Sequence, residues 1–128
     1  MSYYIARTVS GVFDKTVERV VDALKREGFG VLTEIDVSTT MKQKLGVDFR
    51  KYRILGACNP ALAHRALSAD DKIGVMLPCN VIVQELSPGQ VEVAAVDPME
   101  AMARIGSSAL ASIAREVAER LDRVVKAV

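Results

Sequence analysis

The chain has 128 residues, of which half are apolar and 26% are charged, and its formal net charge is +1. That length suits one domain whose core needs neither disulfides nor a structural metal. The small net charge gives no general attraction to nucleic acid, and a chain without tryptophan is poorly equipped to stack single-stranded bases. Composition therefore predicts a single domain, residues 1–128, with no nucleic acid partner.

The sequence shows no pattern of a secretory signal and no apolar run near the roughly 18 residues that a membrane span requires. We therefore expect a cytoplasmic protein with no membrane partner. In that reducing compartment the two cysteines, Cys58 and Cys79, are expected to be free thiols rather than a structural disulfide.

The first half of the chain alternates between strand and helix patterns. Residues 3–9 alternate as a strand does, and a helical stripe of Val17, Val20, Val21 and Leu24 follows, with Gly28 as its stop. Residues 29–38 alternate again and predict a second strand with one buried face. A short helix is expected over about 39–45, before Gly46.

The second half begins with a strong strand, residues 52–58, which stops at Asn59-Pro60. Asn59 is suited to cap a helix whose first residue is Pro60. An apolar segment then leads to Cys79, where a hairpin is predicted to begin, with its turn at residues 87–90. From Asp97-Pro98 a long segment runs to the C-terminus, and its second half carries one apolar stripe: Ile113, Val117, Leu121, Val124 and Val128.

This order of elements contains a clear hairpin and few long crossovers. It favours an α+β domain with a mostly antiparallel sheet, helices packed on one face and a long C-terminal helix. A doubly wound parallel sheet is the alternative.

Each cysteine is followed by asparagine, in Cys58-Asn59 and Cys79-Asn80. If the two strands that carry these pairs are antiparallel neighbours, the end of one and the start of the other share a sheet edge, and the thiols approach each other. Parallel strands would separate them by roughly 17 to 20 Å. The topology is thus a test of whether the pairs form one site.

The runs "GACNP", "LPCNV" and Asp97-Pro98 carry a resemblance that extends over nearly the whole chain. They resemble the Domain of Unknown Function 302 family of bacterial and archaeal proteins. The resemblance implies a mainly antiparallel sheet with helices on one side and a homodimer as the common assembly. It identifies neither a biochemical role nor a cofactor, because the role of the family is unassigned.

Cys58 lies directly before a predicted helix N-terminus, where unpaired amides favour the thiolate form. The asparagines add amide groups that can hold a ligand or a water molecule beside sulfur. The alternative is that both cysteines are small core residues and both asparagines are cap or turn residues.

Other chemistry has weaker support in the residue spacing. A zinc site would have to combine Cys58 and Cys79 with His64, Asp97 or Glu100, and no CxxC or HxxxH spacing is present, so we predict no metal site. Thiol redox chemistry would use Cys58 as nucleophile and Cys79 as resolving thiol, without the usual CxxC motif. The sequence leaves open whether the protein is an enzyme.

Two further segments have both a structural and a functional interpretation. Residues 41–53 carry five cationic side chains against one acidic residue, which suits either an anion-binding rim or a solvated connector. The small residues 106–109 are expected within the last helix, where they favour close helix packing or a dimer contact over room for a ligand.

We therefore expect a small-molecule or anion site formed by Cys58, Asn59, Cys79 and Asn80. The family resemblance adds the expectation of a homodimer. A thiol-dependent redox or metal-handling protein is the first alternative. A structural dimerisation module without a ligand is the second.

Overall fold

Five strands form one sheet in the computed structural model, which describes residues 2–128. The strands are β1 (Tyr4–Ser10), β2 (Gly30–Asp36), β3 (Tyr52–Cys58), β4 (Cys79–Ser87) and β5 (Gln90–Val96). Their spatial order is β1-β5-β4-β3-β2, and every neighbouring pair is antiparallel. The predicted antiparallel sheet and its hairpin, β4 and β5, are confirmed.

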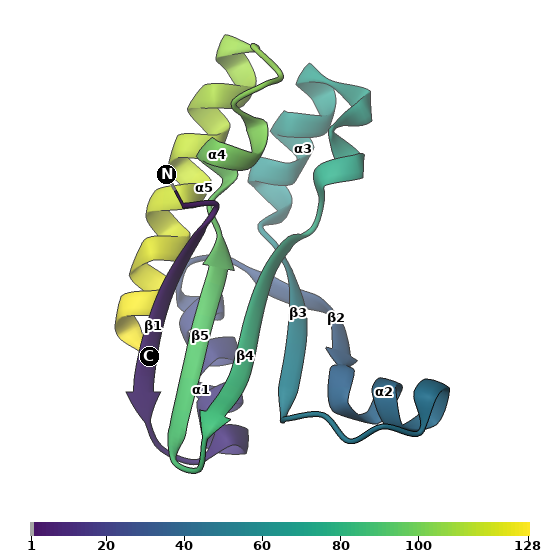
Figure 1. Cartoon of the computed structure of the whole chain (residues 1–128). Helices are drawn as coiled ribbons and strands as arrows, with labels where there is room; N and C mark the ends of the chain where they lie inside the picture. The colour runs from purple at the N-terminus through teal and green to yellow at the C-terminus, as the bar shows by residue number, and fades with distance from the viewer. Residues whose placement is uncertain (1) are drawn as a thin grey trace.

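The long helices cover a single face of this sheet (Figure 1). Helix α1 (Phe13–Arg26) contacts β4 and β5, and α5 (Ser108–Ala127) contacts β1, β5 and α1. The shorter helices are α2 (Val37–Leu45), α3 (Pro60–Ala69), α4 (Pro98–Met102) and the 3-10 helix η1 (Asp71–Met76). The α+β class with a long C-terminal helix is confirmed, and none of the helices in the described part of the chain covers the opposite face of the sheet (Figure 1).

The core lies between the sheet and the helices, where the apolar faces of the strands pack against the apolar stripes of the helices. Leu55 of β3, Val81 and Val83 of β4 and Val93 of β5 are fully buried on the helix-covered face. The helices supply the stripes that their spacing predicts, and the fully buried members of these stripes are Val20, Leu24, Leu121 and Val124. Burial of each such side chain stabilises the fold by about 1.5–3 kcal/mol before entropy is counted.

Two sequence predictions are wrong in detail. Strand β2 has no buried residue, because it is an edge strand that pairs only with β3. The small residues 106–109 are not inside a helix: Gly106 has a φ of +74°, and Ser107 caps α5 by accepting a hydrogen bond from the Leu110 amide at 3.2 Å. The last segment is therefore two helices, α4 and α5, separated by a turn.

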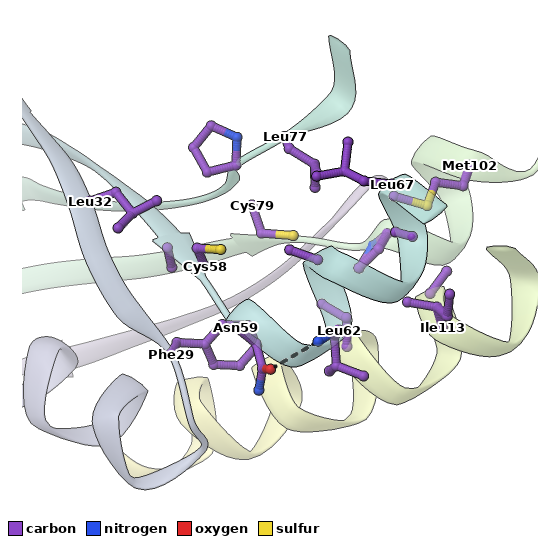
Figure 2. Close-up of a pocket in the computed structure, with 17 residues that line it drawn as sticks. Phe29, Leu32, Cys58, Asn59, Leu62, Leu67, Leu77, Cys79, Met102 and Ile113 are labelled. Carbon is purple, nitrogen blue, oxygen red and sulfur yellow. Dashed lines mark hydrogen bonds between the residues drawn. The ribbon is translucent and has the colours of Figure 1, made fainter. Parts of the chain in front are cut away.

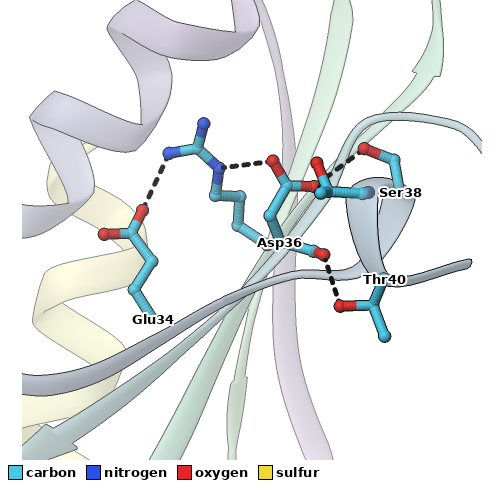
Figure 3. A network of polar contacts seen from close by, with 6 residues as sticks. Glu34, Asp36, Ser38 and Thr40 are labelled. Atoms are coloured by element: carbon cyan, nitrogen blue, oxygen red, sulfur yellow. Dashed lines mark hydrogen bonds and ion pairs between the residues drawn. The ribbon is translucent and has the colours of Figure 1, made fainter. Parts of the chain in front are cut away.

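Polar contacts fix the end of β2 to β3 and α2 (Figure 3). Arg53 donates from Nη1 to Glu34 at 2.8 Å and lies 3.8 Å from Asp36. Asp36 caps α2 by accepting hydrogen bonds from the Thr39 amide and the Ser38 hydroxyl, and these bonds hold the pKa of its carboxyl below the ordinary value. This network has a structural role at the edge of the sheet opposite β1.

Candidate functional site

The pairing of β3 with β4 brings the two cysteines together. The two strands are antiparallel, and Ala57 is the register partner of Cys79, so Cys58 follows directly at the end of β3 where β4 begins. The two strands that carry the cysteines are therefore antiparallel neighbours, as a single site requires. Burial and, to a smaller extent, the neighbouring Cys58 raise the pKa of Cys79.

Both cysteines line one pocket at this end of the sheet (Figure 2). Its volume is about 300 Å³, at the lower end of the range for small-molecule sites. The walls come from the ends of β3 and β4 and from helices α3, α4 and α5. The largest side chains that line it are Phe29, Leu32, Leu62, Leu67, Leu77, Met102, Ile113 and Val117.

The pocket is almost entirely apolar. Among the described residues, 2–128, Asn59 supplies the only polar side chain in the lining besides the two thiols, and none of the lining residues is charged. An ion in such surroundings would lose its hydration without gaining an opposite charge, which is costly. The geometry thus favours an uncharged apolar ligand over the anion that the sequence left open.

Asn59 lines the pocket but also has the structural role that its sequence position predicts. Its Oδ1 accepts a hydrogen bond from the Leu62 amide at 3.2 Å and so caps α3, with Pro60 in the first turn (Figure 2). Gly28 makes room for this side chain: it has a φ of +85°, and a Cβ there would lie 2.9 Å from Asn59 Nδ2. The side-chain oxygen of Asn59 is thus already used in capping α3.

Asn80 does not join the other three predicted site residues. It follows Cys79 in β4, and because successive strand residues point to opposite faces, it lies on the open face of the sheet. There it lines a different hollow together with Tyr52 and Gln84. The structure therefore brings Cys58, Asn59 and Cys79 together and leaves Asn80 outside that pocket.

The two thiols differ in their surroundings. Cys79 is buried, with 9% of its surface exposed, whereas Cys58 is half-buried. Burial, with a smaller contribution from the Cys58 charge, raises the pKa of Cys79 to about 11, so this thiol is protonated at neutral pH. Of the two, Cys58 is the one that a reagent or ligand can reach from the solvent side.

Several pocket residues escaped prediction from the sequence. Leu32 reaches the pocket because the register of β2 against β3 shifts between Val31 and Thr33, a bulge that no residue pattern marks. Pro98 and Met102 belong to α4, which the sequence merged with α5. A usable signal did exist in α3, where Leu62 and Ala66 recur at helical spacing and are buried.

The residues considered for a metal do not gather around the thiols. His64 lines a separate hollow between α3 and α5 with Arg65 and Ser112, and Asp97 caps α4 by accepting from the Met99 amide at 3.0 Å. Within residues 2–128, no group of three His, Cys, Asp or Glu side chains is arranged to hold a metal ion.

Three of the five cationic side chains of the basic segment have polar partners nearby. Lys42 pairs with Asp48 at 3.0 Å, Arg53 pairs with Glu34, and Arg50 donates to Gln84 at 2.9 Å. The connector interpretation of this segment agrees with these contacts. Over the same described stretch, no helix has the length and apolar composition to cross a bilayer.

Comparison with known proteins places the chain by family and by fold. The family model described as "Domain of unknown function DUF302" matches residues 5–128. The crystal structure of an uncharacterized conserved DUF302 protein from Bacillus stearothermophilus is similar over 98% of both chains, with 31% sequence identity and a TM-score of 0.90. No curated protein matches.

Proposed function

Since the chain belongs to the DUF302 family, whose function is unknown, we propose that it binds a small, uncharged, apolar molecule in the pocket beside Cys58 and Cys79. The observation that carries this proposal is an apolar pocket of about 300 Å³ with no charged residue in its lining. Ligand sites usually combine apolar walls with a few placed polar groups, and here those groups are two thiols and one amide. A cytoplasmic location is part of the proposal, because a reducing compartment keeps both thiols free.

A neutral fluorescent dye, N-phenyl-1-naphthylamine, tests this function by titration. We expect saturable binding of one dye per chain and its displacement by 1-octanol. Ala63→Leu places extra bulk in the pocket and should weaken binding about tenfold or more, a cost of roughly 1.4 kcal/mol.

The matched control is Ala61→Leu, the same substitution on the exposed side of α3. It should bind the dye as the unaltered chain does. Equal binding by the two variants, or no saturable binding by the unaltered chain, would remove the proposal.

Thiol redox chemistry is the second candidate function. The observation that favours it is that Cys58 and Cys79 line the same pocket at neighbouring strand ends. Its test is incubation with oxidised glutathione followed by intact mass measurement. A disulfide between the two cysteines would support this function. A lasting glutathione adduct on Cys58, without exchange to Cys79, would contradict it.

We also propose a homodimer that pairs through the open face of the sheet. A row of apolar residues crosses all five strands there in direct register: Ala6, Ala94, Ile82, Ile54 and Ile35. Beside this row Arg50 donates to Gln84, which donates to Glu92 at 2.8 Å, so the charges of Arg50 and Glu92 offset each other. A second copy would meet an apolar surface with little like-charge repulsion.

Sedimentation tests the dimer. Ile82→Glu introduces a charge at the centre of the row and should give a monomer, whereas Val75→Glu, at a side chain 84% exposed in η1, should leave the dimer intact. A chain that sediments as a monomer without any substitution would contradict the proposal.

A further inference from the structure

Two cysteine thiols line one apolar pocket. Binding of an inert apolar molecule would require neither of them. Cys79 is more than nine-tenths buried, and no residue in the range 2–128 forms a hydrogen bond with its thiol. Cys58 is half-buried and lines the same pocket (Figure 2). Alanine or valine would fill these positions without leaving a polar S–H group unpaired.

The thiols also differ in burial and in their position in the fold, which gives them different chemical roles. Because its pKa is about 11, Cys79 keeps its proton and is a weak hydrogen-bond donor. Cys58 lies at the exposed side of the pocket, directly before Asn59, the N-cap of the ten-residue helix α3, so its sulfur is the one that a molecule entering the pocket can reach. One thiol is therefore placed as a nucleophile and the other as a donor.

We infer that the ligand is an alkyl α,β-unsaturated aldehyde or ketone, which Cys58 captures covalently while the Cys79 thiol donates a hydrogen bond to the carbonyl oxygen. This inference rests on the proposed function, because it names the class of molecule that the pocket takes. The alkyl chain occupies the apolar walls, and the conjugated carbonyl lies at the two sulfurs.

The reaction needs no oxidant, metal or leaving group. The S–H bond of Cys58 breaks, its sulfur forms a bond to the β-carbon, and the C=C double bond becomes single as the electron pair moves toward the carbonyl. The carbonyl oxygen gains negative charge, which the Cys79 S–H group stabilises. Cys58 releases its proton to solvent, and a proton from solvent then adds to the α-carbon, so that protons balance. The product is a thioether.

Intact mass measurement with a series of trans-2-alkenals from 2-pentenal to 2-nonenal tests the inference on the full chain. We expect one adduct, mapped to Cys58 by peptide mass. Its rate relative to glutathione should rise about fourfold for each methylene buried, until the pocket is full. A relative rate that does not change with chain length, or an adduct mapped mainly to His64 or a lysine, would overturn the inference.

Variants separate the roles of the two thiols. Cys58→Ser should abolish the adduct. Cys79→Ala should leave Cys58 as the site but slow the reaction several-fold, and an unchanged rate would overturn the donor role of Cys79. Ala63→Leu should remove the dependence on chain length, whereas Ala61→Leu should retain it. Circular dichroism identifies any variant that does not fold, and the chain-length series on the unaltered protein needs no variant.

A saturated analogue distinguishes failure of this inference from failure of the proposed function. 1-Nonanol has a comparable alkyl chain and no electrophilic carbon, so it reports binding alone. If it displaces the dye from the pocket while no alkenal adduct forms at Cys58, capture is wrong and apolar binding stands. If it does not bind, both are wrong.

Discussion

The two faces of the sheet use the same strands for different purposes. The helix-covered face is a dry core that opens, at the ends of β3 and β4, into a pocket without charged residues. The open face carries the apolar row through Ile82, a polar chain through Gln84, and a hollow lined by all three tyrosines. This difference is the basis for our proposals that one face encloses a small molecule and that the other meets a second copy of the chain.

The repeated Cys-Asn pair shows how this difference arises. In Cys79-Asn80 both residues are within a strand, so alternation sends the thiol to the pocket and the amide to the open face. In Cys58-Asn59 the chain leaves the strand for a helix, so both residues line the pocket. Identical dipeptides therefore have different roles because one lies inside a strand and the other at its end.

The largest effect is expected at Gly56, which lies in β3 opposite Asn80. A Cβ at this position would lie 2.1 Å from Thr33 Oγ1 and 2.9 Å from Pro78 Cγ. Thr33 can rotate but the proline ring has little freedom, so Gly56→Ala should lower the free energy of unfolding by about 3 kcal/mol. Urea denaturation measures this loss.

Gly30→Ala is the control for that substitution. Gly30 lies in β2, pairs with Cys58, and has no atom within 4 Å of an added Cβ. Its free energy of unfolding should change by less than about 1 kcal/mol. Similar losses for the two variants would show that steric contact at Gly56 does not explain its effect.

The next effect is a loss of stability at high pH that depends on Cys79. Its pKa rises from about 9 to about 11 on folding, so below pH 9 the thiol is protonated in both states and its contribution is constant. Between pH 9 and 11 the unfolded chain releases this proton while the folded chain retains it, which favours unfolding. The resulting loss reaches about 2–3 kcal/mol by pH 11.

Cys79→Ala removes this titration and isolates it from that of lysines and tyrosines. The difference in unfolding free energy between the unaltered chain and the variant should be flat below pH 9 and shrink above it. A difference that stays constant to pH 11 would mean that burial does not perturb this thiol.

The smallest effect compares the two asparagines. Asn59→Ala removes the cap of α3 and should cost about 1 kcal/mol, whereas Asn80→Ala, at an exposed position, should change stability by less than about 0.5 kcal/mol. Thermal unfolding of both variants in one buffer measures the contrast. Equal losses would show that the two Cys-Asn pairs are structurally equivalent after all.

Local chemistry explains why much of the fold could be predicted. Three features depend only on residues adjacent in sequence: the end of β3 at Cys58, the cap of α3 by Asn59, and the end of α2 at Gly46, which has a left-handed backbone conformation. The helical stripes also follow from periodicity alone, because one face of α1 and of α5 must be buried. Even the approach of Cys58 and Cys79 followed once an antiparallel sheet was favoured.

What could not be predicted depends on position in the assembled sheet. Alternation in β2 predicts a buried face, but β2 is an edge strand with a neighbouring strand on one side only, and none of its residues is buried. The bulge that brings Leu32 to the pocket arises from pairing with β3, and the turn at Gly106 interrupts a segment of otherwise good helix formers. Sequence adjacency suggests that Asn80 belongs with Cys79, but strand alternation places the two side chains on opposite faces of the sheet.

Methyl NMR with 1-octanol as the ligand tests the central claim most directly, because methyl groups report each face of the sheet separately. The pocket is reported by Leu62, Met102 and Ile113, and the open face by Ile54 and Ile82. The account predicts saturable shifts of the three pocket methyls and none at the two isoleucines of the open face. Shifts confined to Ile54 and Ile82, or no saturable shift at the pocket methyls, would contradict it.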